Sequence, residues 1–334
     1  MRYKTVTPLP NSVFFSLKMP LNHAIIENMI KLIATAESVE QAKGLLDAGV
    51  DSLYIGDERF ALRLAEPLSK EEITEITRLA HEAGKEVIVG LNAIMHVEKM
   101  KDLRSYLDFL QELGVDQITV GDAGVIQVLQ TEGYQLPFIY DASTMVVSAR
   151  QVNFWARQGA EGAVLARELP KPELEAMAEE LVVPGEILVY GASVIHHSLR
   201  PLLQNYYNFI QTDEKKDRAS GHFLSEPKDK ETHYSIFEDE HGTHIYATDD
   251  LDMMNELTDL KAMGYEHWKL DGIFTRGEAF VEIAKIFNEA RKLVEAGELT
   301  ADKAFMLDEQ VRKLHPVGRT LGTGFYNVDP DTIK

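Results

Sequence analysis

A short motif recurs four times in this chain and constrains its fold more than any other feature. In each copy a helical stretch ends at glycine, one or two polar residues follow, and an apolar segment begins. The copies are LLDAGVDSLYIG at residues 45–56, AHEAGKEVIVG at 80–90, LQELGVDQITVG at 110–121 and ARQGAEGAVLA at 156–166. Glycine ends helices because it adopts the left-handed conformation without a steric penalty. The repetition predicts helices that alternate with buried strands, as in a parallel sheet.

The same alternation extends over most of the chain. We expect strands at residues 30–34, 52–55, 86–91, 117–120, 138–140, 162–165, 187–190 and 267–270, the seventh breaking off at Gly191. Helices are expected at 38–48, 69–83, 100–113, 123–131, 148–158, 171–181 and 277–293. Eight strands with helices between them favour an α/β fold, a (β/α)8 TIM-like barrel. A doubly wound open sheet is the alternative, and the lack of a GxGxxG after any strand weakens it.

The remaining segments divide the chain into three parts. Residues 1–28 lack any period and contain three prolines, so we expect a loosely ordered extension, with Met29 a candidate for the working start. Residues 29–295 form the barrel, including an insertion at 211–247 between strands seven and eight. That insertion is charged and rich in turns, with a hairpin expected at 236–247. It either lies over the barrel mouth or is a surface loop without a role. Residues 296–334 form a C-terminal helix and tail.

Composition narrows the chemistry of this 334-residue chain. It has no cysteine, which excludes disulfides, thiolate catalysis and cysteine-ligated zinc or iron–sulfur clusters within it. No apolar run is long enough to span a membrane, and no secretory signal is evident, so we expect a cytoplasmic protein without membrane contact. The net charge of −20 repels phosphate backbones. A role on nucleic acid therefore requires a local basic patch or a partner subunit. The simpler interpretation, that the acidity only keeps the protein soluble, is favoured.

Polar residues gather directly after the predicted strands. In a barrel these positions share one face, where active sites lie. Besides residues 56–59, they are Asn92, Asp122, Asp141, Arg167, Glu168, His196, His197, Arg200 and Asp271. Together they predict a site for an anionic or polyhydroxy substrate. Each residue alone has a simpler explanation, since Asp122 and Asp141 in particular could cap helices.

Two histidine pairs stand out. His196 and His197 are adjacent, so on an extended chain one faces the pocket while the other faces away; a neutral imidazole there could act as a general base or a metal ligand. His241 and His244, close to Glu238 and Asp239, form either a loose metal site or a hairpin turn, and the turn is favoured. No HExxH, GxSxG or P-loop motif occurs, so zinc-protease, serine-hydrolase and nucleotide-triphosphatase functions lack support.

Several segments together resemble a known family. They are LVYGASVIHHSLRPLLQNYY at residues 188–207, FEDEHGTHIYATDDL at 237–251 and GYEHWKLDGIF at 264–274, with VLARELP and the closing LGTGFY in support. The chain thereby resembles the collagenase-like peptidases of unassigned catalytic type, the U-32 peptidases, over residues 30–326. The resemblance implies a (β/α)8 barrel. It is greatest to a short bacterial branch that works with a longer paralogue to make 5-hydroxyuridine at the tRNA wobble position.

The resemblance also bears on cofactors. Several members hold an iron–sulfur cluster on four cysteines, two of which fall where Val194 and Pro201 stand here, with the other pair after Tyr207. This chain has none of the four, so we expect no cluster in it, while a divalent metal stays open. Family positions that are retained are Gly191, Ser198, Arg200, Asn205, Tyr206, Glu238, Gly242, Asp250, Lys269 and Asp271.

Three functions follow, in order of preference. The first is a subunit for wobble-uridine 5-hydroxylation that reaches tRNA through a complex with a longer, cysteine-containing paralogue. The second is a peptidase, and the third is a barrel that binds a small anionic metabolite without turnover. The predicted catalytic residues are His196, His197, Arg200 and Asp271. The predicted substrate-binding residues are Asn92, Asp122, Asp141, Arg167, Glu168, Asn205, Tyr206 and Lys269.

Overall fold

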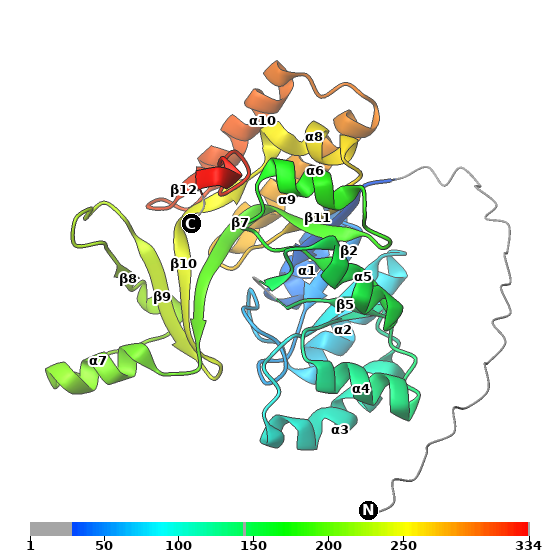
Figure 1. The fold of residues 1–334 in the computed structure, drawn as a ribbon, viewed down its shortest axis with the longest axis vertical. Coiled ribbons are helices and arrows are strands. Elements are labelled where there is room, and N and C mark those ends of the chain that lie inside the picture. Colours follow the sequence, from blue (N-terminus) through cyan, green and yellow to red (C-terminus); the bar gives the residue numbers. More distant parts are fainter. Residues whose placement is uncertain (1–28, 143–144, 333–334) are drawn as a thin grey trace, which may run out of the picture.

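A computed structural model describes residues 29–142 and 145–332, and it contains the predicted barrel (Figure 1). Within these residues, eight parallel strands close on themselves because β11 pairs with both β1 and β7. The strands are β1 (Lys31–Thr35), β2 (Ser52–Ile55), β3 (Glu86–Leu91), β4 (Gln117–Val120), β5 (Phe138–Tyr140), β6 (Ala160–Val164), β7 (Gly185–Ser198) and β11 (His267–Leu270). The predicted (β/α)8 class is confirmed. The expected extension at residues 1–28, and with it the question of Met29, lies outside the described residues.

Helices surround the barrel, and the first two begin directly after the expected caps, Ser38 and Ser69. They are α1 (Val39–Asp47), α2 (Lys70–Glu82), α3 (Val97–Leu113), α4 (Ala123–Glu132), α5 (Ala149–Arg157), α6 (Lys171–Ala178), α8 (Leu257–Ala262), α9 (Gly277–Glu295) and α10 (Ala301–Leu314). Ser69 and Glu72 form a reciprocal capping box at the start of α2, which satisfies backbone N–H groups that have no partner within the helix. The glycines of the four repeated motifs that end their helices, Gly49, Gly84, Gly114 and Gly159, all have positive φ, as the motif predicts.

The core has two layers separated by the strands. Apolar residues on the outer faces of the strands pack against the helices in one large cluster. Inside the barrel, Ile33, Tyr54, Ile88 and Ile139 form a smaller buried cluster. These inward-facing side chains fill the lower barrel, and the carboxyl end of the barrel is the end at which active sites of this fold lie.

Strand β7 differs from the prediction, because it does not end at Gly191 but continues to Ser198. At Gly191 the backbone has a φ of +121°, and an added Cβ would lie 2.4 Å from the carbonyl oxygen of Asp271. Only glycine fits this conformation and this close approach. The chain therefore leaves the barrel here without losing strand geometry, because β10 takes over as its antiparallel partner.

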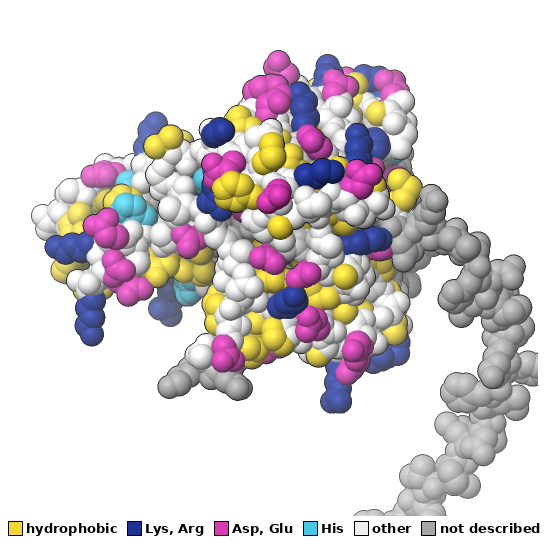
Figure 2. All heavy atoms as spheres, turned by 90° about the horizontal axis from the view of Figure 1, so that it is seen from above, with side chains coloured by type: hydrophobic (Ala, Val, Ile, Leu, Met, Phe, Trp, Pro, Cys, Tyr) yellow, Lys and Arg dark blue, Asp and Glu magenta, His cyan; other side chains and the backbone are white. Residues whose placement is uncertain are grey.

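The outer half of β7 starts a side sheet. Its further strands are β10 (Gly242–Asp252), β9 (Tyr234–Asp239), β8 (Phe223–Leu224) and β12 (Thr320–Gly322), with α7 (Leu202–Ile210) packed beside them. The predicted hairpin at 236–247 is the β9–β10 pair, which turns at Glu240 and His241. The side sheet projects from the barrel, and on the face seen from above acidic and basic side chains are interspersed (Figures 1 and 2).

The side sheet is attached to the loop that follows β2. Arg218 donates to the carbonyl oxygen of Leu64 at 2.8 Å and pairs with the carboxylate of Glu66 at 3.0 Å. His241 contacts the carbonyl oxygen of Glu58 through Nε2 at 2.5 Å. The insertion therefore borders the barrel mouth and holds one of its loops. No helix in the described ranges has the length and apolar character needed to cross a membrane.

The fit at Gly191 can be tested by substitution. We expect Gly191→Ala to lower the free energy of unfolding by roughly 3 kcal/mol or more, because the new Cβ would meet the Asp271 backbone. Gly84→Ala is the control: Gly84 also has positive φ, but nothing lies within 4 Å of its added Cβ, so about 1 kcal/mol is expected. Urea unfolding measures both, and equal losses would contradict a steric role for the Asp271 backbone.

A buried carboxyl pair joins the end of β10 to α10. Burial raises the pKa of Asp252 to about 7, and the neighbouring carboxyl of Asp308 adds to the rise, while the Met254 N–H and the Arg312 guanidinium oppose it. Because this pKa lies above the usual value of 3.8, protonated Asp252 favours the folded state. Its contribution is complete below about pH 4 and is lost as the pH rises through 7.

This linkage predicts the behaviour of Asp252→Asn, which stays neutral and can still accept from Met254. Between pH 5 and 8, the wild-type free energy of unfolding should fall relative to that of the variant by roughly 1–3 kcal/mol. Urea unfolding at several pH values measures the difference. Asp302→Asn on the exposed face of α10 serves as the control and should parallel the wild type. Parallel curves for Asp252→Asn would refute the assignment.

Candidate functional site

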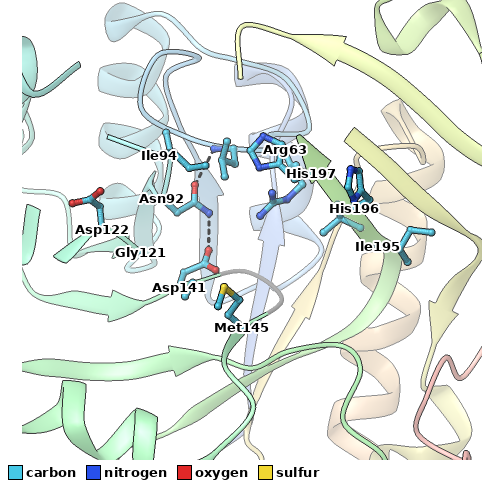
Figure 3. Close-up of a pocket in the computed structure, with 14 residues that line it drawn as sticks. Arg63, Asn92, Ile94, Gly121, Asp122, Asp141, Met145, Ile195, His196 and His197 are labelled. Atoms are coloured by element: carbon cyan, nitrogen blue, oxygen red, sulfur yellow. Dashed lines mark hydrogen bonds between the residues drawn. The ribbon is translucent and has the colours of Figure 1, made fainter. Parts of the chain in front are cut away.

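The carboxyl end of the barrel opens into a pocket of about 460 Å³ (Figure 3). Asn92, Asp122, Asp141, His196 and His197 are among its lining residues. A narrower recess continues from it into the barrel and is lined by Asn92, Asp141, Arg167, Lys269 and Asp271. The structure thus brings most of the strand-end residues named from the sequence to one rim, as a closed parallel barrel requires.

The pocket floor is a hydrogen-bonded pair. Asn92 follows β3 and Asp141 follows β5, and the Asn92 amide donates to the Asp141 carboxylate at 2.6 Å. The Asn92 carbonyl accepts from the Leu62 N–H at 2.9 Å, which sets the orientation of its amide. The floor therefore presents a fixed amide beside a carboxylate, a combination suited to reading a polar ligand edge.

Lys269 carries a buried positive charge at the base of the recess. Its ammonium group lies 3.5 Å from the centroid of the Tyr54 ring and 3.4 Å from Glu186 Oε1. Burial opposes its charge, but the Glu186 carboxylate and further acidic groups outweigh burial, so the pKa of Lys269 is raised. Lys269 therefore stays protonated and can stabilise negative charge, but it cannot serve as a base.

Arg167 and Asp271 face each other across the same recess. Arg167 donates to the carbonyl oxygen of Ala192 at 2.9 Å and lies 3.9 Å from the Asp271 carboxylate. Asp271 also accepts from the Ile273 N–H at 3.0 Å. These bonds hold both side chains at the mouth, so they can bind or orient a substrate without first rearranging.

His197 is the better placed of the adjacent histidines. Its ring stacks on that of His244 with centroids 4.6 Å apart, and Nε2 donates to the carbonyl oxygen of His241 at 2.9 Å. This bond leaves Nδ1 as the acceptor. Burial lowers the pKa of His197, with His244 and Arg63 acting in the same direction and the bond to His241 opposing. His197 is thus a neutral potential base, whereas His196 is exposed at the pocket edge.

The remaining residues predicted for the site lie at the edge of the pocket or outside it. Asp122 lines the pocket edge, but its carboxylate caps α4 by accepting from Gly124 N–H at 2.7 Å. Glu168 lies before α6, and burial raises its pKa, but it lines neither cavity. Arg200, Asn205 and Tyr206 are exposed beside the side sheet, because β7 continues past the mouth and carries them away from it.

The second histidine pair belongs to the hairpin. His244 contacts Asp239 at 2.9 Å, and Lys99 contacts His241 Nδ1 at 2.9 Å. Across residues 29–142 and 145–332, no three or more histidine, aspartate or glutamate side chains are grouped to hold a metal ion. These contacts account for both histidines as structural groups of the β9–β10 turn and its attachment to the barrel.

Arg63 also borders the mouth, although no motif in the sequence indicated it. It lines the pocket, the recess and a further cavity of about 350 Å³ beneath the side sheet. Its φ is +54°, a left-handed conformation that costs a residue with a Cβ roughly 1 kcal/mol or more. Strain of this kind persists where the surrounding structure enforces it, often at functional sites. The one signal in the sequence was its place in the loop that follows a barrel strand.

Comparison with known proteins identifies the family. The model of Peptidase family U32 matches residues 37–334. The chain belongs to peptidase family U32. One relative, tRNA hydroxylation protein P2 of Bacillus subtilis, is 34% identical over 301 residues, which span 89% of this chain and 97% of that protein. From the same organism, tRNA hydroxylation protein P1 is 24% identical over 92% of this chain and 73% of its own length.

A third relative extends this pattern. The tRNA hydroxylation protein P of Escherichia coli is 25% identical over 82% of this chain and 69% of its own length. The resemblance inferred from the sequence is therefore confirmed at the level of the family.

The iron–sulfur cluster that the family resemblance implies does not fit these residues. Val194, at one of the expected cysteine positions, is buried in an apolar cluster with Ala192, Phe237, Tyr246 and Ile273. Pro201, at another, precedes α7. Neither offers a ligand atom for iron, and the whole chain has no thiolate. In this U32 protein, the side chains at those positions pack or shape the backbone.

The backbone strain at Arg63 can be measured separately from the side-chain contacts of its guanidinium, by comparing two variants that lose the same contacts. Arg63→Gly and Arg63→Ala both remove the guanidinium, but only glycine accepts a φ of +54° freely. We expect Arg63→Gly to be more stable than Arg63→Ala by about 1 kcal/mol in urea unfolding. The same pair of substitutions at Arg59, in the same loop, is the control, and there glycine should give no advantage. Equal stabilities for the two Arg63 variants would contradict a strained backbone.

Proposed function

We propose that this chain is a subunit of the system that hydroxylates the wobble uridine of tRNA at C5, acting with a cysteine-bearing paralogue of its family. The observation that carries the proposal is the 34% identity to tRNA hydroxylation protein P2, which this chain matches over 97% of that protein's length. A match over nearly the whole length indicates the same domain content.

The barrel mouth supports this role. Asn92 and Asp141 offer hydrogen-bonding groups for a base edge, and protonated Lys269 offers positive charge that can stabilise negative charge developing on the base. His197 offers a neutral imidazole that can accept a proton. Replacing the C5 hydrogen of uracil by a hydroxyl group removes two electrons from the base, so an oxidant and a source of the oxygen atom have to come from outside this chain. This chain has no redox-active thiolate, so we assign binding and proton transfer to it and no redox step.

A partner follows from the same reasoning. With a net charge of −20, the chain as a whole repels the phosphates of tRNA, so we assign most of the attraction for the RNA to a partner. Protein P1 of Bacillus subtilis aligns with most of this chain and is longer. A longer U32 paralogue that brings cysteine ligands and a basic surface meets both needs.

The peptidase hypothesis gains nothing from the described residues. Those that line the pocket and the recess include no serine or threonine, and no histidine–carboxylate pair faces a nucleophile there. Binding of a small anionic metabolite without turnover remains the third hypothesis, and it rests on the sequence alone.

Gene deletion with complementation tests the proposal. Mass spectrometry of bulk tRNA should show that deletion removes 5-hydroxyuridine derivatives and that the wild-type gene restores them. The double variant Lys269→Met/Glu186→Gln should restore at least about tenfold less, because it removes the buried charge without leaving Glu186 unpaired. The matched control is Lys303→Met/Glu298→Gln, an exposed ion pair, which should restore fully. Unchanged 5-hydroxyuridine after deletion would overturn the proposal.

A further inference from the structure

Three exposed apolar side chains surround the pocket at the barrel mouth. Ile94 is 42% exposed, Met145 69% and Ile195 45%, and all three line the same cavity (Figure 3). They come from separate segments, after β3, after β5 and on the outer half of β7. A single exposed apolar residue needs no explanation. Three of them around one pocket whose floor is polar indicate a ligand that has apolar faces and a polar edge.

We propose that this pocket holds one pyrimidine base turned out of the RNA, with the apolar rim against its faces, the Asn92–Asp141 pair at its polar edge and Arg63 at its phosphate. This inference rests on the proposed function and adds where and how the RNA is held. A nucleobase has two apolar faces and a rim of donors and acceptors, which is the pattern that the pocket presents.

The floor can read such an edge. The contacts described for Asn92 use one of its two amide hydrogens and one carbonyl lone pair, for Asp141 and Leu62 respectively. The amide can therefore still donate to a uracil carbonyl or accept from the ring N–H. A cavity of about 460 Å³ falls within the range of small-ligand pockets. A base in an anticodon loop is unpaired, so turning it outward costs less than in a duplex.

Arg63 is positioned for the phosphate by the side sheet. Arg218 holds the backbone of the same loop at Leu64, and Glu66 accepts from both Arg218 and Arg276. These bonds hold the residues next to Arg63, whose backbone is left-handed and whose side chain lines the pocket (Figure 3). A guanidinium matches the geometry of phosphate oxygens better than any other side chain. The insertion would thus act as the support for an RNA contact.

Binding of two anticodon stem-loop RNAs tests the inference. One carries uridine at the wobble position and the other an abasic nucleotide there. The protein is the full chain, purified with any partner that stays bound to it. The wild type should bind the uridine RNA about fivefold or more tightly than the abasic RNA, because the abasic RNA has no base to bury against the apolar rim. Met145→Asp should abolish this preference. Met306→Asp on α10 is the matched control, since Met306 is 64% exposed and distant from the pocket in sequence, and it should keep the preference.

Variants of Arg63 should change RNA affinity in a different way from Met145→Asp. Arg63→Gly should weaken binding of both RNAs by a similar factor, since each keeps its phosphates, and Arg63→Lys should restore binding only in part. Equal affinity of the wild type for both RNAs, or equal effects of Met145→Asp and Met306→Asp, would overturn the inference. Loss of 5-hydroxyuridine on gene deletion together with equal affinities would leave the proposed function standing and reject the base pocket. A clear preference for the uridine RNA, together with unchanged tRNA modification after gene deletion, would support the base pocket and reject the proposed function.

Discussion

Pairing of β11 with both β1 and β7 is the constraint on which the rest of the molecule depends. It closes the sheet, so that every parallel strand ends at one rim and polar residues that are far apart in the chain become neighbours. Asn92 and Asp271 are separated by more than half of the chain, yet both line the recess. In an open doubly wound sheet, the first and last strands would not meet, and no such recess would form.

The second constraint is the passage of β7 out of the barrel at Gly191. The strand serves two sheets: it completes the barrel with β11 and then pairs with β10. Because glycine permits the bend, the inserted strands are connected rigidly to the barrel. The side sheet can then hold the loop of Arg63 through Arg218, so a segment with little apparent order in its sequence contributes to the mouth.

Charge is distributed unevenly between the mouth and the rest of the molecule. The chain as a whole is strongly acidic, yet Arg63, Arg167 and Lys269 converge at the barrel mouth, balanced by carboxylates that orient them. The field of the whole chain works against nucleic acid, while the local groups suit a nucleotide. The two proposals are therefore complementary: a partner attracts the RNA, and the pocket of this chain accepts one base of it.

The sequence by itself determined the barrel class, most strand and helix positions, and the lack of cysteine ligands. Those features depend on local signals: the period of apolar residues, glycine after helices, caps such as Ser69, and composition. Only the tertiary structure decided which polar residues share the site. Arg200, Asn205 and Tyr206 follow a barrel strand in sequence but lie outside the site, because β7 finds a new partner instead of ending at Gly191. Arg63 lies at the mouth in a loop that distant Arg218 contacts through the carbonyl oxygen of Leu64. Both outcomes depend on contacts between segments far apart in the chain, and no local pattern encodes such contacts.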